Sequence, residues 1–85
     1  MTSKRVLFIC TGNRARSQMG EGLLRHLAGD RFEAHSAGTL PSGLADETIL
    51  VMREIGIDVR GQWSKHVDEF AQGVASPIEI AVSSE

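Results

Sequence analysis

Residues 6–17 (VLFICTGNRARS) constrain the fold more than any other part of this 85-residue chain. The unbroken apolar run at residues 6–9 is typical of a strand that is covered on both faces. It leads directly into CTGNRARS, after which the pattern becomes that of an amphipathic helix. The only cysteine of the chain, Cys10, is therefore expected where a buried strand ends, six positions before Arg16 and just ahead of a helix.

A loop between a strand and a helix is suited to binding a tetrahedral oxyanion. Its successive N–H groups can turn inward as a nest, and the following helix adds the positive end of its dipole. Arg16 can grip two oxygens with its planar guanidinium. The same positive surroundings lower the pKa of a thiol, so Cys10 is predicted to be a thiolate beneath the bound group, placed to attack it.

Composition limits the other classes of function. The net charge of −2 provides no basic surface for nucleic acid or for an anionic membrane. No apolar run approaches the ~20 residues of a membrane span, and residues 1–5 contain no apolar signal region. A single cysteine fits a reducing, cytoplasmic setting. The three histidines lack metal-ligand spacing, so we expect no metal, and we expect no cofactor. The length of the chain predicts one domain over residues 1–85.

Alternating strand and helix patterns predict an α/β fold with a small parallel sheet flanked by helices. Strands are expected at residues 4–9, 32–37 and 78–82, helices at residues 17–29 and 44–55, and one or two helical turns at residues 65–72. The expected strand order is 2-1-3, which makes the first strand central. The cysteine loop then lies at the topological switch point, where open α/β sheets bind ligands.

Each predicted helix has its own signals. Ser17 is a natural N-cap, and Glu21 lies in the early turns, where a carboxylate suits the helix dipole. The first apolar stripe comprises Met19, Leu23, Leu24 and Leu27, and the second comprises Leu44, Thr48, Val51, Met52 and Ile55. The second helix is expected to stop at Gly56.

The loop resembles the C-x-G-N-x-x-R-S signature of the low-molecular-weight protein tyrosine phosphatases and of the arsenate reductases built on the same fold. The resemblance continues through SQM and EGLL, then SAGT at residues 36–39, IGID at residues 55–58, and SK and DEF between residues 64 and 70. It covers about residues 4–70 and is closer to the arsenate-reductase branch. It implies that Cys10 is the nucleophile, that Arg16 clamps the oxyanion and that Asn13 braces the loop.

The remaining loop residues have narrower expected roles. Ser17 is grouped with Cys10 and Arg16 as catalytic, because its hydroxyl can donate toward the cysteine sulfur. The predicted oxyanion-binding residues are Thr11, Gly12, Asn13, Arg14, Ala15 and Arg16, mostly through backbone N–H groups. Arg14 either adds positive charge at the rim or is simply solvated. Residues 36–39 either approach the loop or form a plain exit from the second strand.

The sequence also departs from the family pattern in two ways. Ala15 stands where many members carry a second cysteine, and no cysteine follows in the rest of the chain. The family's general acid is an aspartate in a D-P loop, and no D-P dipeptide is present here. The chain resembles the N-terminal portion of such a fold.

Three functions remain open on these grounds. A phosphomonoester such as phosphotyrosine would be attacked by Cys10, with weak turnover expected without a general acid. Arsenate would be attacked in the same way, and the arsenic reduced with a second thiol from outside, such as a small-molecule thiol or a redoxin. The alternative is a non-catalytic oxyanion-binding or assembly module. A homodimer or another partner is expected to cover the exposed edge of the sheet.

Overall fold

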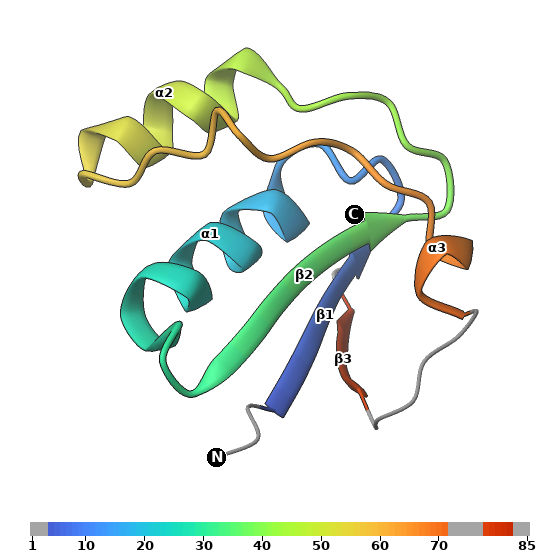
Figure 1. The fold of residues 1–85 in the computed structure, drawn as a ribbon. Helices are drawn as coiled ribbons and strands as arrows, with labels where there is room; N and C mark the ends of the chain where they lie inside the picture. Colours follow the sequence, from blue (N-terminus) through green and yellow to red (C-terminus); the bar gives the residue numbers. More distant parts are fainter. Residues whose placement is uncertain (1–3, 72–77, 83–85) are drawn as a thin grey trace.

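The computed structural model describes residues 4–71 and 78–82, and it confirms the predicted α/β class. The elements are β1 (Lys4–Cys10), α1 (Arg16–Ala28), β2 (Phe32–Gly38), α2 (Asp46–Glu54), α3 (Asp68–Ala71) and β3 (Ile78–Val82). The strands are parallel in the order β2-β1-β3, so β1 is central (Figure 1). Helix α3 occupies part of the predicted turns at residues 65–72, and residue 72 lies outside the described residues. None of the helices described is long and apolar enough to cross a membrane.

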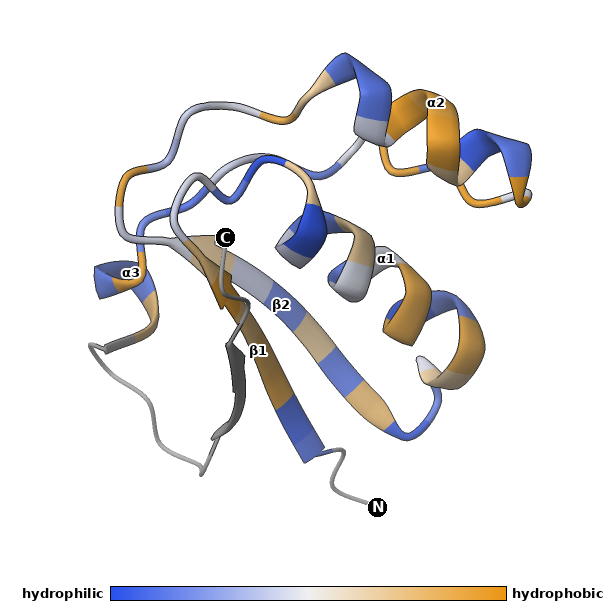
Figure 2. Ribbon diagram, turned by 180° about the vertical axis from the view of Figure 1, so that it is seen from behind, coloured by the Kyte–Doolittle hydropathy of each residue, from blue (hydrophilic) through white to orange (hydrophobic). Residues whose placement is uncertain are grey.

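The middle of β1 is apolar and its first residues are polar (Figure 2). Leu7 is buried and lies beside His35 of β2, while Cys10 at the end of the strand lies beside Gly38. The strand is one residue longer than predicted, because Cys10 still pairs with β2 before the chain turns into the loop. The cysteine is therefore held by the sheet itself.

Helix α1 packs on β1 and β2, and α2 contacts α1 (Figure 1). The predicted apolar stripes match the buried faces only in part. Thr48 and Met52 of α2 are buried, and Met19 of α1 packs against Met52. Other stripe residues are exposed, with Leu27 at 73% and also Leu23, Val51 and Ile55. The buried residues of α1 are instead Ser17, Gln18, Glu21, Gly22 and Ala28. Polar side chains can be buried there because they have hydrogen-bond partners in the neighbouring segments, as described below.

The predicted N-cap of α1 is wrong. The helix begins at Arg16, and Ala15 at the N-cap position makes no side-chain capping bond. Ser17 lies within the first turn, where its hydroxyl is directed at Cys10 and Asn13 rather than at a helix N–H group. Helix α1 therefore lacks the stabilisation of about 1 kcal/mol that an N-cap side chain such as serine typically contributes.

Helix α2 has the predicted acidic first turn, with Asp46 and Glu47 at its positive end. It ends in a Schellman motif, in which Gly56 has a φ of 82°. The N–H of Gly56 donates to the Arg53 carbonyl at 3.0 Å, and the N–H of Ile57 donates to the Met52 carbonyl at 2.9 Å. This turn packs Ile57 onto Met52.

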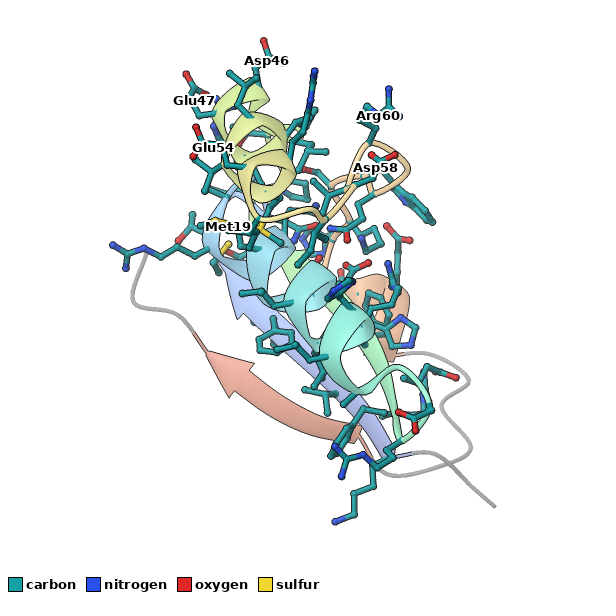
Figure 3. The ribbon with its side chains drawn as sticks, turned by 90° about the vertical axis from the view of Figure 1, so that its left-hand side faces the viewer. Met19, Asp46, Glu47, Glu54, Asp58 and Arg60 are labelled. Atoms are coloured by element: carbon teal, nitrogen blue, oxygen red, sulfur yellow. The ribbon has the colours of Figure 1, made fainter. Side chains whose placement is uncertain are left out.

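A small apolar cluster joins the two helices. Met52, Ile57 and Val59 are buried together, and Met19 of α1 packs against them. Figure 3 shows Met19 between α1 and α2, with Asp58 and Arg60 pointing away from this cluster. The cluster fixes α2 and the segment after it on α1, and so positions the residues that surround the cysteine loop.

Candidate oxyanion site

The loop at residues 11–15 turns its carbonyl groups outward. Three of them accept hydrogen bonds from the segment that leads from β2 into α2. These bonds run from Leu40 N to Thr11 O (2.8 Å), from Ser42 N to Gly12 O (2.9 Å) and from Ala45 N to Arg14 O (3.1 Å). Because successive carbonyls are held on the outer side, the N–H groups of the same peptides are turned toward the inside of the loop. This is the geometry of an anion-binding nest.

Asn13 braces the loop from within. It is fully buried, and its φ of 48° places it in the left-handed region that asparagine tolerates better than most residues. The backbone N–H of Lys65 donates to Asn13 Oδ1 at 2.7 Å, which fixes the orientation of the amide because a backbone N–H can only donate. Asn13 Nδ2 then donates to Ser17 Oγ at 2.8 Å.

These contacts orient the Ser17 hydroxyl toward the cysteine. Ser17 Oγ accepts from Asn13, and it lies 2.8 Å from Cys10 Sγ. The backbone N–H of Asn13 also donates to Cys10 Sγ, at 3.2 Å. Since Ser17 Oγ already accepts from the amide, its own proton is available to the sulfur. The arrangement is suited to a thiolate.

The balance of forces on Cys10 lowers its pKa. Burial alone raises the pKa of the Cys10 thiol, because a charged sulfur loses hydration. This effect is outweighed by the Ser17 side-chain hydrogen bond and by backbone N–H groups of Ser17, Asn13 and Arg14, which all favour the thiolate. The net pKa lies below that of an ordinary thiol, which increases the fraction of reactive thiolate at neutral pH.

A pocket of about 270 Å³ opens above the sulfur. Its lining consists of Cys10, Gly12, Arg14, Ala15 and Arg16. Two arginines therefore contribute to the pocket lining, and none of its lining residues is acidic. The pocket can accept a small anion over the sulfur.

A second, larger pocket of about 470 Å³ lies near the end of α2. It is lined by Ile49, Arg53, Gly56, Ile57, Asp58 and Arg60. Arg60 lowers the pKa of Asp58 to about 2 through their hydrogen bonds, so this carboxylate is ionised and paired. We place the chemistry in the smaller pocket because the larger one is lined by no nucleophilic side chain such as cysteine or serine, and its one carboxylate, Asp58, is paired with Arg60.

The end of β2 lies directly beneath the loop. A Cβ atom at Gly38 would lie 2.5 Å from the Thr11 carbonyl oxygen and 2.9 Å from the Asn13 nitrogen. Only glycine leaves room for this approach. Residues 36–39 therefore do approach the loop, through Gly38, while the Ser36 hydroxyl donates elsewhere, to Glu21.

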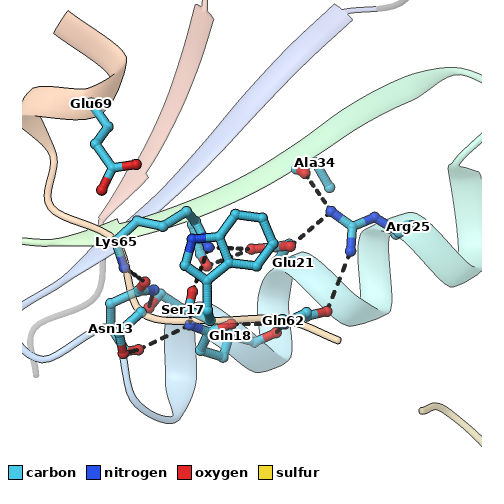
Figure 4. A network of polar contacts seen from close by, with 12 residues as sticks. Asn13, Ser17, Gln18, Glu21, Arg25, Ala34, Gln62, Lys65 and Glu69 are labelled. Atoms are coloured by element: carbon cyan, nitrogen blue, oxygen red, sulfur yellow. Dashed lines mark hydrogen bonds and ion pairs between the residues drawn. The ribbon is translucent and has the colours of Figure 1, made fainter. Parts of the chain in front are cut away.

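A buried polar network supports the site from behind (Figure 4). Glu21 is 4% exposed and Lys65 is 6% exposed, and their charged atoms lie 3.5 Å apart. Glu21 also accepts from Ser36 at 2.5 Å and from Arg25 at 2.7 Å. The prediction that Glu21 serves the helix dipole is therefore replaced by a structural role, since its carboxylate joins α1 to β2 and to the segment beside the loop.

Gln18 links the same segments. It is fully buried, and its Nε2 donates to the carbonyls of Asn13 at 3.0 Å and Trp63 at 2.9 Å. Trp63 itself is 63% exposed and does not line the pocket above Cys10.

In the part of the chain that the structure describes, no group of three or more histidine, cysteine, aspartate or glutamate side chains could hold a metal ion.

Comparison with known proteins identifies the family. The family model described as low molecular weight phosphotyrosine protein phosphatase matches residues 5–76. The chain belongs to this family. Among curated relatives of this phosphatase family, the arsenate reductase of Shouchella clausii (strain KSM-K16) is 43% identical over 70 residues, which cover 80% of this chain and 50% of that protein. The arsenate reductase of Bacillus subtilis (strain 168) is 41% identical over 68 residues, covering 80% and 49% respectively.

Two solved structures have a similar fold. An arsenate reductase in the phosphate binding state superposes with a TM-score of 0.77 and 31% identity, over 92% of this chain and 75% of that one. A low molecular weight protein tyrosine phosphatase from T. tengcongensis superposes with a TM-score of 0.74 and 33% identity, over 94% and 58%. The chain spans about half the length of the curated relatives it matches.

The structure brings together the residues that the phosphatase-family signature singled out. Cys10, Asn13 and Ser17 form one hydrogen-bonded group, and Arg14 and Arg16 border the pocket. The sequence reasoning missed Gln18 and Lys65 as supports of the loop. Both residues lie in stretches that resemble the family, SQM and SK, but their residue types gave no sign of a supporting role, because glutamine and lysine are ordinarily solvent-exposed.

Proposed function

We propose that Cys10 is a thiolate nucleophile that attacks an oxyanion bound in the loop, and that the reaction is the reduction of arsenate. The observation that carries this proposal is the position of Cys10 Sγ. It lies at the base of the pocket, 2.8 Å from Ser17 Oγ and 3.2 Å from Asn13 N, with a lowered pKa. The identity to arsenate reductases supports arsenate as the substrate.

In the proposed first step, the thiolate attacks arsenic from below. A Cys10 sulfur–arsenic bond forms, and the arsenic–oxygen bond opposite the sulfur breaks, so that the oxygen leaves as water after protonation. The loop N–H groups and Arg16 hold the remaining oxygens, and their positive charge stabilises the negative charge of the transition state. Ser17 donates to the thiolate before the attack, which places the sulfur and keeps it ionised.

The second step needs another thiol. Its thiolate attacks Cys10 Sγ, a disulfide forms, and the sulfur–arsenic electron pair leaves with arsenic, which is reduced from the pentavalent to the trivalent state as arsenite. Cys10 is the only cysteine of these 85 residues, so we propose an external small-molecule thiol or a redoxin as the donor. A reducing compartment such as the cytoplasm maintains such donors, and we propose that location.

Hydrolysis of a phosphomonoester is the second candidate, and the family model favours it. Cys10 would attack phosphorus, an alcohol or phenol would leave with a proton, and water would then hydrolyse the cysteinyl phosphate. A general acid contributes about 10²–10⁴-fold to such reactions, and none borders the pocket among the described residues. We therefore expect weak turnover of esters. No observation on the described residues favours a purely non-catalytic module.

One assay separates these functions. The chain is incubated with arsenate and dithiothreitol or a redoxin, and arsenite is measured, in parallel with release of phenol from an aryl phosphate. We expect arsenite that depends on both the thiol and Cys10, and Cys10→Ser as the matched control should form none. Phenol release without any arsenite would replace arsenate reduction with ester hydrolysis as the proposed function. The absence of both products would refute both proposals.

We also propose that a second copy or a partner covers the edge of the sheet. β2 and β3 are the outer strands of the described sheet, and Leu23 and Leu27 present apolar surface beside it. Light scattering over a range of protein concentrations tests this proposal. We expect a mass above that of one chain, and a monomer at every concentration would contradict self-association.

A further inference from the structure

Arg14 provides a second positive charge at the pocket, in addition to Arg16. Its side chain is exposed and forms part of the pocket lining. Its carbonyl is held by the N–H of Ala45 at 3.1 Å and by the Thr48 hydroxyl at 3.0 Å, so the backbone from which the side chain starts is fixed. A fixed backbone limits where the guanidinium can reach, and the rim of the pocket is within that reach.

The aliphatic part of the Arg14 side chain lies against Gly12, and Arg14 is one of the residues that line the pocket. A Cβ atom at Gly12 would lie 3.5 Å from Arg14 Cβ and 3.8 Å from Arg14 Cδ, so the aliphatic part of the arginine covers the loop backbone. Arg14 Nη1 donates to the Ser42 carbonyl at 3.5 Å, which is too long for a strong hydrogen bond. The guanidinium is therefore held beside the pocket only by a weak contact with the segment between β2 and α2, and an anion can easily replace this contact.

The position of the guanidinium matters because of the geometry of in-line attack. An oxyanion over Cys10 directs three oxygens into the loop and its fourth substituent away from the sulfur, toward the mouth. In free arsenate or phosphate this substituent is an oxygen, which can accept a charge-assisted hydrogen bond. In an ester it carries a carbon group. The lining contains no aromatic or large apolar side chain on which such a group could pack.

We propose that Arg14 makes this site selective for free inorganic oxyanions over their esters, by binding the oxygen that points out of the pocket. The inference rests on the proposed function, because it requires an oxyanion above Cys10. Arg14 is thus a specificity-determining residue. In the reductive reaction this outward oxygen is the one that leaves, so the same contact stabilises it as its bond to arsenic breaks.

The test compares phosphate with methylphosphonate, which has nearly the same shape but a methyl group in place of one oxygen. Each protects Cys10 from alkylation by iodoacetamide if it binds over the sulfur, and the concentration for half-protection gives its affinity. We expect Arg14→Ala to weaken phosphate about tenfold, the effect of one charge-assisted hydrogen bond, and methylphosphonate less than about twofold. Arg53→Ala removes the same charge from α2 and should change neither affinity.

The outcomes separate this inference from the proposed function. If Arg14→Ala weakens both ligands equally, or neither, the inference is overturned while the oxyanion site stands. If neither ligand protects Cys10 in the unmodified chain, both fail. If Arg14→Lys, which keeps the positive charge, also loses the preference for phosphate over methylphosphonate, the planar guanidinium is required as well. If Arg14→Ala keeps this preference, the assignment to Arg14 is refuted.

Discussion

The hydroxyl of Ser17 lies 2.8 Å from the sulfur of Cys10, and two further hydrogen bonds and the start of α1 explain why it points there. The Lys65 N–H fixes the Asn13 amide, the amide donates to Ser17 Oγ, and the first turn of α1 carries the serine past the end of β1. Residues separated by 52 positions in the sequence thus determine the ionisation of a single thiol. The site is a property of the whole fold as well as of the loop.

Replacing Ser17 by alanine should raise the pKa of Cys10. The hydroxyl is the strongest single contribution that lowers this pKa, so its loss leaves burial opposed only by backbone N–H groups. The rate of alkylation by iodoacetamide, measured against pH, reports the thiolate fraction. Ser42→Ala is the matched control, because Ser42 makes no contact with the sulfur among the hydrogen bonds of the described residues. An unchanged titration in Ser17→Ala would contradict this assignment.

The lowered thiol pKa should also make the stability of the fold depend on pH. A group whose pKa is depressed by folding contributes stability that is fully present above its pKa in the unfolded chain, and this contribution is lost as the pH falls through the folded pKa. The free energy of unfolding should therefore rise with pH across that window, relative to Cys10→Ser. Urea denaturation of both proteins at several pH values measures this difference. A difference that is flat or falls with pH would disagree with a stabilised thiolate.

Gly38→Ala should displace the loop. The new methyl group would lie 2.5 Å from the Thr11 carbonyl oxygen, and this contact is with backbone, which cannot rotate away. We expect a loss of about 1–3 kcal/mol in the free energy of unfolding and a slower reaction of Cys10 with iodoacetamide. Gly61→Ala is the control, since no atom lies within 4 Å of its Cβ position, and it should be neutral or slightly stabilising. Equal effects of the two changes would argue against the close packing.

Removing the Glu21 carboxylate should destabilise the protein strongly. Glu21→Ala would leave the buried ammonium of Lys65 without its 3.5 Å partner, a situation that costs about 3–5 kcal/mol. Thermal or urea unfolding measures the loss. The double variant Glu21→Gln, Lys65→Met removes both charges and should recover much of the stability. If the double variant is as unstable as Glu21→Ala, the charge pairing is not the cause.

The sequence was sufficient for the parts of the fold that depend on local order. The apolar run before Cys10 predicted the central strand, and Gly56 predicted the end of α2, because both signals come from neighbouring residues. Within residues 6–9 only Leu7 is fully buried, and the other three are partly buried. The exposure of Leu23 and Leu27 was not predictable in the same way. Apolar spacing indicates that a helix has an apolar face, but it does not indicate which face the neighbouring elements cover.

The candidate site was predictable in its centre and not in its surroundings. Cys10 and Arg16 could be placed together from their spacing and from the strand that precedes them. The contacts of Asn13 with Lys65 and of Glu21 with Ser36 join segments far apart in the chain, and no local pattern encodes them. Ser17 was expected both to cap the helix and to donate to the sulfur. In the structure its hydroxyl is hydrogen-bonded to Cys10 and Asn13, and it makes no capping bond among the described residues.

The most direct test of the central claim is the pH dependence of Cys10 alkylation with and without arsenate. The structure predicts that the rate reaches half its maximum at a lower pH than for an unperturbed cysteine thiol, because the thiolate is stabilised by Ser17 and the loop N–H groups. Saturating arsenate should slow the reaction by occupying the pocket above the sulfur. An ordinary thiol titration, together with a rate that arsenate does not change, would contradict a thiolate beneath an oxyanion site.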